Sequence, residues 1–382
     1  MQHKALIIGG GISGLSAAYY LSKAGIRPTL LERKPRVGGV IQTCVQQGCV
    51  LEEGPDGFMA AKPWAMNLIR ELGLADQVMG SNDHSRVTYI VKKGKLVPMP
   101  EGLMMMVPTK ILPLVETRLL SWGAKFRMGM EFFRQPPERP QPDRSVYEFL
   151  LDHYGEECID YLAEPLLAGV YGGDPRDMSV NSVLARFVEI ESKYGSLTRG
   201  VLAASRPKGA KAKSSGGSFL LTLKGGLGDL IKALRPSADV VQADVETVET
   251  TSGGFRVRAN GDWLEAEHVV VATPAGDAAP LVQALQPELA GLLAGIPYTS
   301  SITLALGYRQ STFDHPLQGH PILFLPVAIR SARGGDGLAR QVRLQEPIAV
   351  APTSLDDPSP DQQGQTDLGT RLFQRRDSLD LL

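Results

Sequence analysis

The 382-residue sequence lacks the features that define several classes of protein. It has three cysteines, Cys44, Cys49 and Cys158, whose spacing fits no metal site. Free thiols in a reducing cytosol are our first interpretation, and a disulfide between Cys44 and Cys49 across a hairpin is the alternative. A formal net charge of −1 argues against a nucleic-acid partner. No hydrophobic run reaches the roughly 18 residues that span a bilayer, and we expect no signal peptide because a strand begins almost at once.

Catalytic groups of the usual kinds are also missing. No Ser/His/Asp grouping and no metal cluster can be recognised, so we name no catalytic acid or base and no metal ligand. The chain is otherwise ordinary, with 43% hydrophobic and 21% charged residues, and its length predicts about two domains. We expect surface or structural roles for the histidines, which are His3, His84, His153, His268, His315 and His320.

The first 33 residues follow the order of a dinucleotide-binding unit. Residues 4–8 are a short apolar run of the kind found in a strand buried on both faces. Gly9-Gly10-Gly11-Ile12-Ser13-Gly14 follows without a spacer and fits the G-x-G-x-x-G pattern. Residues 13–23 then predict a helix, and residues 28–31 predict a second strand that ends in Glu32.

Each part of this unit has a physical role. Gly9 permits the tight turn, Gly11 lets the backbone approach a pyrophosphate, and Gly14 lets the helix pack closely on the strand. The positive end of the helix dipole faces the phosphates, and Glu32, about 20 residues further on, can accept hydrogen bonds from ribose hydroxyls. We infer a bound adenine dinucleotide; the alternative is a glycine-rich turn in another kind of α/β domain.

Two more glycine-rich segments follow. Gly38-Gly39 lets the backbone approach a ligand, and the positive charge of the preceding Arg36 can pair with a phosphate. Short strands predicted at 41–46 and 49–52 lead to Gly54-Pro55-Asp56-Gly57, a rigid turn with open backbone. This turn is so near the phosphate loop in sequence that we expect it to lie under a flat cofactor ring, and a surface turn is the alternative.

Residues 103–133 have a different composition. We predict that they are helical, and they are rich in methionine and carry Lys110, Arg118, Lys125 and Arg127. One interpretation is a segment that lines an apolar pocket or lies on a membrane surface. The other is a helical core with a solvated basic edge.

The rest of the sequence predicts a discontinuous nucleotide-binding domain. Helical patterns continue with a break at 168–174, the α/β pattern returns near residue 219, and 300–308 alternates like a strand of a second sheet. Residues 327–382 match neither period, and we predict that they are disordered or poorly packed. The predicted organisation is 1–86 and 213–280 for the nucleotide domain, 87–212 for a helical substrate-binding insertion, 281–326 for part of a substrate domain and 327–382 for the tail.

Five motifs occur in an order that resembles one family of flavoproteins. They are Gly9-x-Gly11-x-x-Gly14, Glu32, residues 37–43, Glu53-Gly54-Pro55-Asp56 and residues 169–175. Together they resemble the oxygen-dependent protoporphyrinogen oxidase family, which includes the flavin-type coproporphyrinogen III oxidases. The first four motifs are shared with amine oxidases and phytoene desaturases, and the run at 169–175 is the more specific one. The resemblance covers about residues 1–326.

This resemblance implies an α/β fold and FAD as the cofactor. The fold would be a Rossmann-like FAD-binding domain of the GR2, or amine-oxidase-like, type, interrupted by a mainly helical insertion, with part of a second mixed-sheet substrate domain. Gly169 would lie on the wall of the substrate pocket. The implied cofactor-binding residues are Gly9, Gly10, Gly11, Ile12, Ser13 and Gly14 at the pyrophosphate, Glu32 at the ribose, Arg33 and Gly39 beside the phosphates, Gly54, Pro55, Asp56 and Gly57 beside the flavin ring, and Val245 at the adenine.

The implied reaction is the oxidation of protoporphyrinogen IX or coproporphyrinogen III to the porphyrin in haem biosynthesis. It proceeds by successive hydride transfers to flavin N5, with O₂ or another electron acceptor regenerating the cofactor. The implied partners are the porphyrinogen, the acceptor and a second copy in a homodimer, and the location is cytoplasmic with peripheral contact to the inner face of the cell membrane. Two alternatives stay open: an FAD-dependent amine oxidase or phytoene desaturase-like enzyme, and an inactive truncated remnant with weak or no FAD binding.

The resemblance stops near residue 326. Members of the family continue with more of the substrate sheet, a glycine-rich segment and a helix that meets the flavin. None of these can be recognised after Pro326, so the sequence predicts a truncated or frame-shifted C-terminal part that lacks one wall of the flavin site. The arginine that the family uses for a substrate propionate is likewise not placed.

Overall fold

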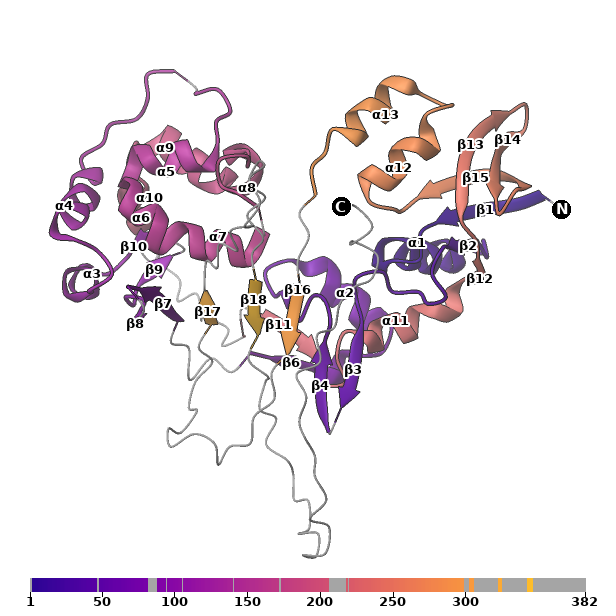
Figure 1. The fold of residues 1–382 in the computed structure, drawn as a ribbon, viewed down its shortest axis with the longest axis horizontal. Helices are drawn as coiled ribbons and strands as arrows, with labels where there is room; N and C mark the ends of the chain where they lie inside the picture. The colour runs from indigo at the N-terminus through magenta and orange to yellow at the C-terminus, as the bar shows by residue number, and fades with distance from the viewer. Residues whose placement is uncertain are drawn as a thin grey trace, which may run out of the picture. The chain divides into compact units, whose positions relative to one another are not determined.

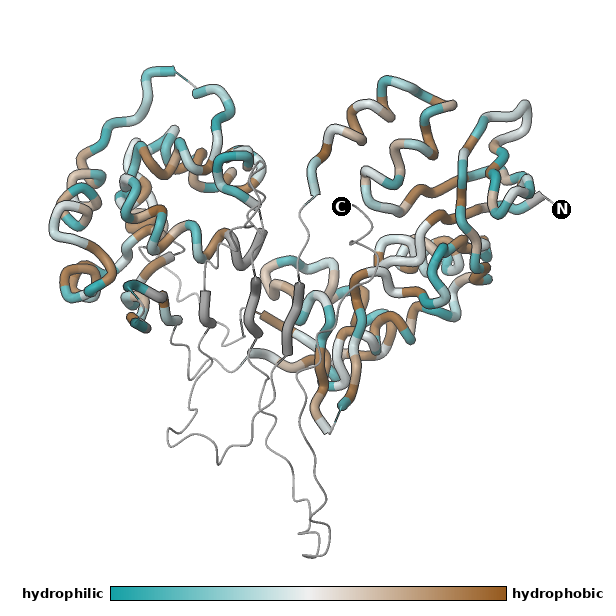
Figure 2. The backbone as a smooth tube through the Cα atoms, in the orientation of Figure 1, coloured by the Kyte–Doolittle hydropathy of each residue, from teal (hydrophilic) through white to brown (hydrophobic). Residues whose placement is uncertain are grey.

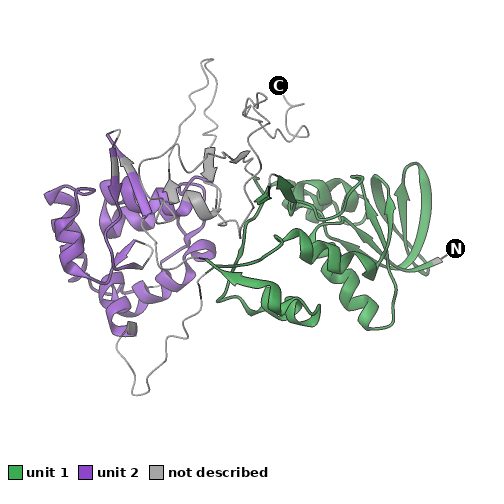
Figure 3. Ribbon diagram, turned by 90° about the horizontal axis from the view of Figure 1, so that it is seen from below, with its two compact units in different colours: residues 1–81, 217–298, 349–356 green, residues 82–216, 299–348, 357–382 purple. Residues whose placement is uncertain are grey.

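The computed structural model describes most of the chain up to residue 298 and short strands beyond it. The chain forms two compact units (Figures 1 and 3), of which unit 1 comprises Met1–Ser81, Gly217–Tyr298 and Ala349–Asp356, and unit 2 comprises Asn82–Gly216, Thr299–Ile348 and Asp357–Leu382. The described residues are 2–46, 48–81, 88–93, 95–104, 106–139, 141–171, 173–205, 218, 220–298, 302–305, 322–324 and 342–345.

Unit 1 is built around a six-stranded sheet in the order β12-β2-β1-β15-β14-β13. The first four of these strands run parallel, and β14 and β13 extend the sheet in antiparallel fashion from β15. Ile8 lies opposite both Leu31 and Val271, so the parallel strands end at one edge of the sheet. The strands are β1 (Gln2–Ile8), β2 (Thr29–Glu32), β12 (Asp239–Gln242), β13 (Val245–Thr251), β14 (Gly254–Ala259) and β15 (Asp262–Val271).

The strand β1 is buried on both faces, as its apolar run predicts. Ile7 belongs to one core with Leu15 and Leu30, whereas Leu6 and Ile8 belong to a second core. Alternate residues of a strand point to opposite faces, so an unbroken apolar run serves both cores. The helices of unit 1 are α1 (Ile12–Lys23), α2 (Pro63–Glu71), α11 (Gly228–Leu234), α12 (Ala275–Val282) and α13 (Pro287–Ala294), with 3₁₀ turns η1 (Ala75–Gln77) and η4 (Arg235–Ser237).

Two small sheets complete unit 1. In the hairpin of β3 (Thr43–Gln46) and β4 (Cys49–Glu52), Cys44 lies opposite Leu51, and all three cysteines are free thiols. The alternative of a Cys44–Cys49 disulfide is therefore wrong, because the register pairs Cys44 with Leu51 and Cys49 with Gln46. The other sheet has the order β5-β11-β6, with β5 at Phe58–Met59, β6 at Val78–Gly80 and β11 at Leu220–Leu223.

Unit 2 is mainly helical around one core. The largest fully buried side chains there include Phe149, Tyr154, Leu119 and Met128. Ser145 and Glu148 form the capping box that the sequence predicts at the start of α5. The helices are α3 (Ile111–Glu116), α4 (Trp122–Glu131), α5 (Val146–Tyr154), α6 (Glu156–Cys158), the π-helical turn η3 (Ile159–Ala163), α7 (Glu164–Tyr171), α8 (Val180–Val183), α9 (Ala185–Tyr194) and α10 (Leu197–Ser205).

Two predictions for this unit are wrong. Residues 103–133 are not continuously helical: β9 (Leu103–Met104) and β10 (Val107–Pro108) form a small hairpin before α3 and α4. Pro108 lies in β10 and Pro113 lies in the first turn of α3. Neither would be tolerated in the interior of one continuous helix, because proline lacks the backbone N–H that a helix uses there. The break predicted at 168–174 begins later, since α7 continues to Tyr171.

Short strands complete the described part of unit 2. β7 (Thr88–Lys92) pairs with β8 (Lys95–Pro98) and with β17 (Ile322–Phe324), and β16 (Ile302–Ala305) pairs with β18 (Val342–Gln345). The strand β18 lies in the tail 327–382, which was predicted to be disordered or poorly packed, and the other tail residues lie outside the described ones. Among the described residues, no helix is long and apolar enough to cross a bilayer.

Candidate flavin site

The glycine loop connects the end of β1 to the start of α1 at the carboxyl edge of the sheet. Gly9 has φ +102°, and a Cβ at this position would come within 2.9 Å of the carbonyl oxygen of Ala272. A Cβ on Gly14 would come within 2.0 Å of the carbonyl oxygen of Gly9. Glycine is therefore needed at both positions, first for the left-handed backbone and then for the close approach of helix to loop.

The N-terminus of α1 is left without a side-chain cap. Gly11 is the N-cap residue, with φ −71° and ψ −177°, and because it is a glycine it provides no side-chain acceptor for the first turn. The first backbone N–H groups of a helix have no partner within the helix, and they carry the positive end of its dipole. Ile12 and Ser13 lie in this turn, so the loop offers donors and positive potential to an anion.

Glu32 ends β2 beside this loop. Its Oε2 accepts the Gly10 N–H at 2.6 Å, and its Oε1 accepts the Lys34 N–H at 2.8 Å. Each carboxylate oxygen has a second lone pair, so the group can still accept from a ligand. Arg33 follows with an exposed side chain, and its carbonyl accepts the Gln242 side-chain amide at 3.5 Å.

The second glycine segment lies against the first. The Gly38 N–H donates to the carbonyl of Gly10 at 2.7 Å, and a Cβ on Gly39 would lie 3.0 Å from Gly11 Cα. The guanidinium of Arg36 donates to the carbonyl oxygens of Val37, Gly39 and Ile41, at 3.0 to 3.4 Å. The sequence analysis expected these guanidinium N–H groups to face a phosphate. In the structure they donate to the backbone of their own loop and so stabilise its conformation.

The third segment, Gly54 to Gly57, follows β4 and lies next to the second. A Cβ on Gly54 would come within 2.0 Å of the Val40 carbonyl oxygen, and one on Gly57 within 2.8 Å of the Leu221 carbonyl oxygen. Pro55 and Asp56 between them are half-buried. The structure thus brings the three glycine segments, which are separated in sequence by α1, β2, β3 and β4, to one part of unit 1.

The other two predicted site residues, Val245 and Gly169, lie outside the glycine segments. Val245 begins β13, shortly after Ala243, whose N–H donates to the Glu32 carbonyl at 3.0 Å. Gly169 lies within α7 of unit 2. The sheet therefore brings Val245 near the end of β2, while Gly169 belongs to a separate unit.

Thr273 is a candidate site residue that the sequence analysis did not single out. It follows β15 at the carboxyl edge, and its methyl carbon would lie 3.1 Å from a Cβ on Gly9. Its Oγ1 is buried and, among the described residues, has no hydrogen-bond partner. A buried hydroxyl without a partner is costly, so this oxygen fits a site at which a bound cofactor supplies a donor or an acceptor. The available signal is a threonine directly after an apolar parallel strand.

Thr43 and Glu52 support the site from the hairpin. Glu52 Oε1 accepts the Leu227 N–H at 2.6 Å, and Thr43 Oγ1 accepts the Gly228 N–H at 2.8 Å, so together they cap α11. Burial raises the pKa of Glu52, against the hydrogen bonds from Thr43 and Leu227, which lower it. These partners are 175 and 185 residues apart in sequence, and no local signal predicts the contact.

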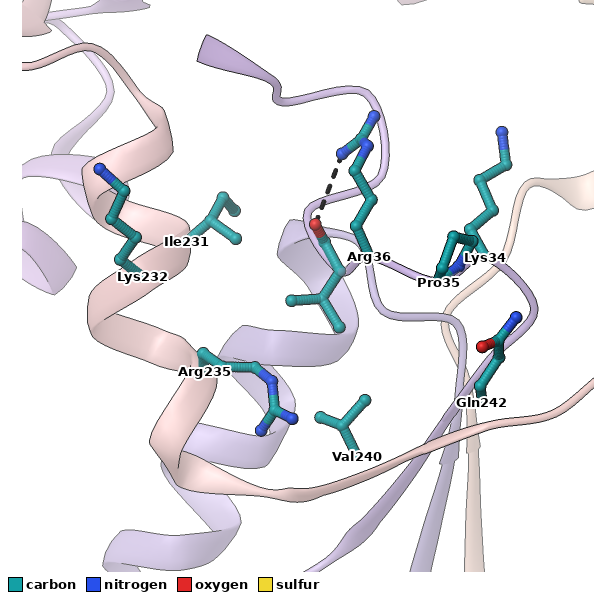
Figure 4. Close-up of a pocket in the computed structure, with 9 residues that line it drawn as sticks. Lys34, Pro35, Arg36, Ile231, Lys232, Arg235, Val240 and Gln242 are labelled. Atoms are coloured by element: carbon teal, nitrogen blue, oxygen red, sulfur yellow. Dashed lines mark hydrogen bonds between the residues drawn. The ribbon is translucent and has the colours of Figure 1, made fainter. Parts of the chain in front are cut away.

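A cationic cavity of about 400 Å³ adjoins the second glycine segment (Figure 4). It lies between the loop after β2, the helix α11 with η4, and the strand β12. Arg36 lines it, and Figure 4 shows the guanidinium bonded to a backbone carbonyl of its own loop. The lining residues are Lys34, Pro35, Arg36, Val37, Ile231, Lys232, Arg235, Val240 and Gln242.

This part of unit 1 has the three features of a dinucleotide-binding domain of the kind found in flavoproteins. They are parallel strands, a helix N-terminus with no side-chain cap from its N-cap residue, and a carboxylate, Glu32, at the end of β2 where a ribose would bind. Comparison with known proteins agrees: the chain belongs to the family described as flavin containing amine oxidoreductase, whose profile matches residues 12–344. The predicted fold class and the predicted cofactor, FAD, are confirmed by this membership. The resemblance stated from the motifs is confirmed by the relatives described next.

Two curated relatives are coproporphyrinogen III oxidases. The protein of Bacillus subtilis (strain 168) is 33% identical over 82% of this chain and 68% of its own length. The protein of Propionibacterium freudenreichii subsp. freudenreichii is 32% identical over 81% of this chain and 64% of its own length. The chain thus spans about two thirds of the length of these relatives.

A solved structure from Exiguobacterium sp. 255-15, assigned as a protoporphyrinogen oxidase, has a similar fold. It superposes with a TM-score of 0.64 at 30% identity, over 76% of this chain and 63% of that one. A putrescine oxidase superposes with a TM-score of 0.51 at 21% identity, which supports the fold alone.

Proposed function

We propose that this chain catalyses the FAD-dependent oxidation of a porphyrinogen to the porphyrin in haem biosynthesis, with O₂ as the acceptor. The observation that carries the substrate class is the 33% identity to a coproporphyrinogen III oxidase across 82% of the chain. Relatives named protoporphyrinogen oxidase are less similar, such as the 27% identical chloroplastic/mitochondrial protein of Arabidopsis thaliana. Of the two substrates, we therefore propose coproporphyrinogen III.

The chain's own residues would bind and orient the cofactor. When bound, FAD would supply the redox chemistry, as the acceptor of the hydrides that leave the bridging CH₂ carbons of the porphyrinogen. The amides of Gly11, Ile12 and Ser13 would hold the pyrophosphate, and Glu32 would accept from the ribose. The turn at 54–57 would lie beside the flavin ring, and Val245 would meet the adenine through its backbone.

The remaining assignments follow the same proposal. Arg33 and Gly39 would flank the phosphates, Gly169 would line the substrate pocket, and no side chain of this chain is assigned as an acid or base. Thr273 is added here because its buried Oγ1 needs a donor or acceptor from outside the described residues.

The decisive experiment is anaerobic reduction of the purified chain after incubation with FAD. We expect a yellow protein whose flavin absorbance is bleached by coproporphyrinogen III. Porphyrin fluorescence should follow once O₂ is admitted and reoxidises the flavin, faster than in a control without the chain. Bleaching by an amine but not by the porphyrinogen would favour an amine oxidase-like enzyme. A folded chain that stays colourless on FAD titration would identify the inactive remnant.

Replacement of Thr273 by valine should weaken FAD binding while leaving the fold intact. Valine keeps the shape but removes the hydroxyl, so we expect FAD affinity to fall by roughly threefold to tenfold, the value of one hydrogen bond. Without FAD, T273V should be no less stable than the parent chain, because the lost group has no partner there. Fluorescence titration with FAD checks this, T273S should restore the affinity, and equal affinities for all three proteins would contradict the assignment.

We also propose that the protein contacts a membrane peripherally through α3 and α4. Large apolar side chains are mostly exposed there, including Ile111 at 78%, Trp122 at 73% and Phe126 at 71%. Figure 2 shows the run of hydrophobic residues along α3. Lys110 and Arg118 add positive charge, which suits the anionic inner leaflet of a cell membrane.

Charge placed on this surface should prevent vesicle binding. We expect Trp122→Glu with Phe126→Glu to lower the bound fraction on phosphatidylglycerol vesicles about tenfold or more, given the 1.5–3 kcal/mol for burying one large apolar side chain. Trp64→Glu is the matched control, because Trp64 in unit 1 is 70% exposed. Vesicle flotation measures the effect. Unchanged binding would refute the contact, and a dimer dissociated by the same double change would show that a second copy covers the surface.

A further inference from the structure

The cavity beside α11 has an unbalanced charge. Of the residues that line it, Lys34, Arg36, Lys232 and Arg235 are basic, and none of the described lining residues is acidic. Two carboxylates lie close by: Asp229 pairs with Lys232 at 2.8 Å, and Asp239 pairs with Arg27 at 2.8 Å and also interacts electrostatically with Arg235. Basic groups that converge on one concave surface repel one another, and the potential they create attracts anions.

The arginines of this cavity are used differently. Arg36 donates to three backbone carbonyls of its own loop. Arg235 makes one hydrogen bond, a long one of 3.5 Å to the Ala238 carbonyl. A guanidinium has five N–H donors, so Arg235 retains donors for a ligand, and Figure 4 shows its head group beside Val240.

The remaining lining is apolar. Val37, Ile231 and Val240 contribute hydrocarbon surface, and Gln242 contributes an amide at one end. The cavity of about 400 Å³ is larger than a phosphate ion needs. Its lining therefore fits a molecule with one anionic head and an apolar body.

We propose that this cavity binds a small phosphomonoester, with Arg235 holding the phosphoryl group and the apolar body packed against Ile231, Val37 and Val240. A phosphoryl group matches the planar fork of an arginine, which can hold two of its oxygens at once. Lys232 and Lys34 supply further positive charge from either side of the cavity. The proposal does not depend on the oxidase activity.

The site must be distinguished from the flavin site, because Val37 precedes Gly38, which bonds to the glycine loop at Gly10. We would titrate the full chain, saturated with FAD, with phenyl phosphate, inorganic phosphate and phenol in a calorimeter. One saturable site for phenyl phosphate is expected, with weaker binding of inorganic phosphate and none of phenol. If the chain takes up no FAD, the same titration on the chain alone still tests the cavity, so the two proposals fail separately.

Substitution of Arg235 locates the binding. Arg235→Glu should weaken phenyl phosphate binding tenfold or more, and Arg235→Lys should restore part of it. Lys224→Glu is the control, because Lys224 is an exposed lysine of unit 1 that does not line the cavity. Equal losses in the Arg235→Glu and Lys224→Glu variants or the absence of a saturable site would each overturn the proposal. So would displacement of phenyl phosphate when FAD is added to a chain that was loaded with phenyl phosphate first.

Discussion

Replacement of Gly14 by alanine is expected to abolish FAD binding at ordinary concentrations. The added Cβ would lie 2.0 Å from the Gly9 carbonyl oxygen, a distance that backbone atoms cannot accept without moving. Helix α1 and the glycine loop must then separate, which turns the first-turn N–H groups away from the pyrophosphate. We expect affinity to fall on the order of a hundredfold, which corresponds to about 2.8 kcal/mol. Titration of the flavin absorbance measures this loss.

A matched substitution shows whether the effect is local. A Cβ on Gly276, in the first turn of α12, would meet nothing within 4 Å. Gly276→Ala should therefore bind FAD like the parent chain and be equally or slightly more stable. If G14A binds FAD as tightly as G276A does, the glycine loop is not the cofactor site, and the flavin assignment for this chain fails with it.

Replacement of His153 by alanine is expected to destabilise unit 2 by about 3–5 kcal/mol. The imidazole is fully buried between α4 and α9: Nδ1 lies 3.0 Å from Glu131 Oε1, and Nε2 lies 3.1 Å from Glu191 Oε1. Without the ring, two buried carboxylates face a void. Urea unfolding followed by circular dichroism checks the loss.

The same carboxylates are held by further groups. Glu131 accepts the N–H groups of Leu197 and Thr198 and the hydroxyl of Ser196, so it caps α10. Glu191 pairs with Arg144 at 2.7 Å. Burial raises the pKa of Glu131 and of Glu191, but the hydrogen bonds from His153 and the other donors outweigh burial, and both pKa values lie below the ordinary 4.5.

The sign of the pH dependence follows from this lowering. A carboxylate whose pKa is lower in the folded chain contributes stability above its ordinary value of 4.5, and this contribution is lost as the pH falls through the lowered pKa. We therefore expect the parent chain to lose stability below about pH 4.5. H153A lacks the bonds that lower these pKa values, so its deficit should shrink in acid. A deficit that is constant between pH 7 and pH 4 would contradict this, and exposed His268→Ala should change stability by less than about 0.5 kcal/mol.

The sequence predicted the regular elements of unit 1 well, because their signals are local. The apolar run at 4–8, the glycine pattern and the helix after it appear as β1, the loop and α1. Sequence patterns are less informative where a continuous segment with one pattern divides into several elements with different partners. Residues 239–251 contain no glycine or proline to mark a break, yet β12 ends at Gln242 and pairs with β2, while β13 begins at Val245 and pairs with β14.

Unit 2 shows the same limit. A single glycine costs a helix only about 1 kcal/mol, so the glycine at 169 does not end α7, which continues to Tyr171. His153 was expected to have a surface or structural role, but its partners come from α4 and α9, 22 and 38 residues away. The periodicity of the sequence does not predict such a contact, because a hydrogen bond between buried side chains of three helices depends on which helices pack together.

The sequence alone determined the cofactor-binding unit of this protein, because backbone turns, helix starts and the acid at the end of β2 are set within about 30 residues of each other. Only the tertiary structure decided what surrounds that unit: the Thr273 hydroxyl beside Gly9, the Thr43 and Glu52 cap on α11, and the arginine-lined cavity. The physical reason is distance along the chain. A glycine turn is fixed by local sterics, whereas a cap, a buried hydroxyl or a cavity forms only when remote segments pack together.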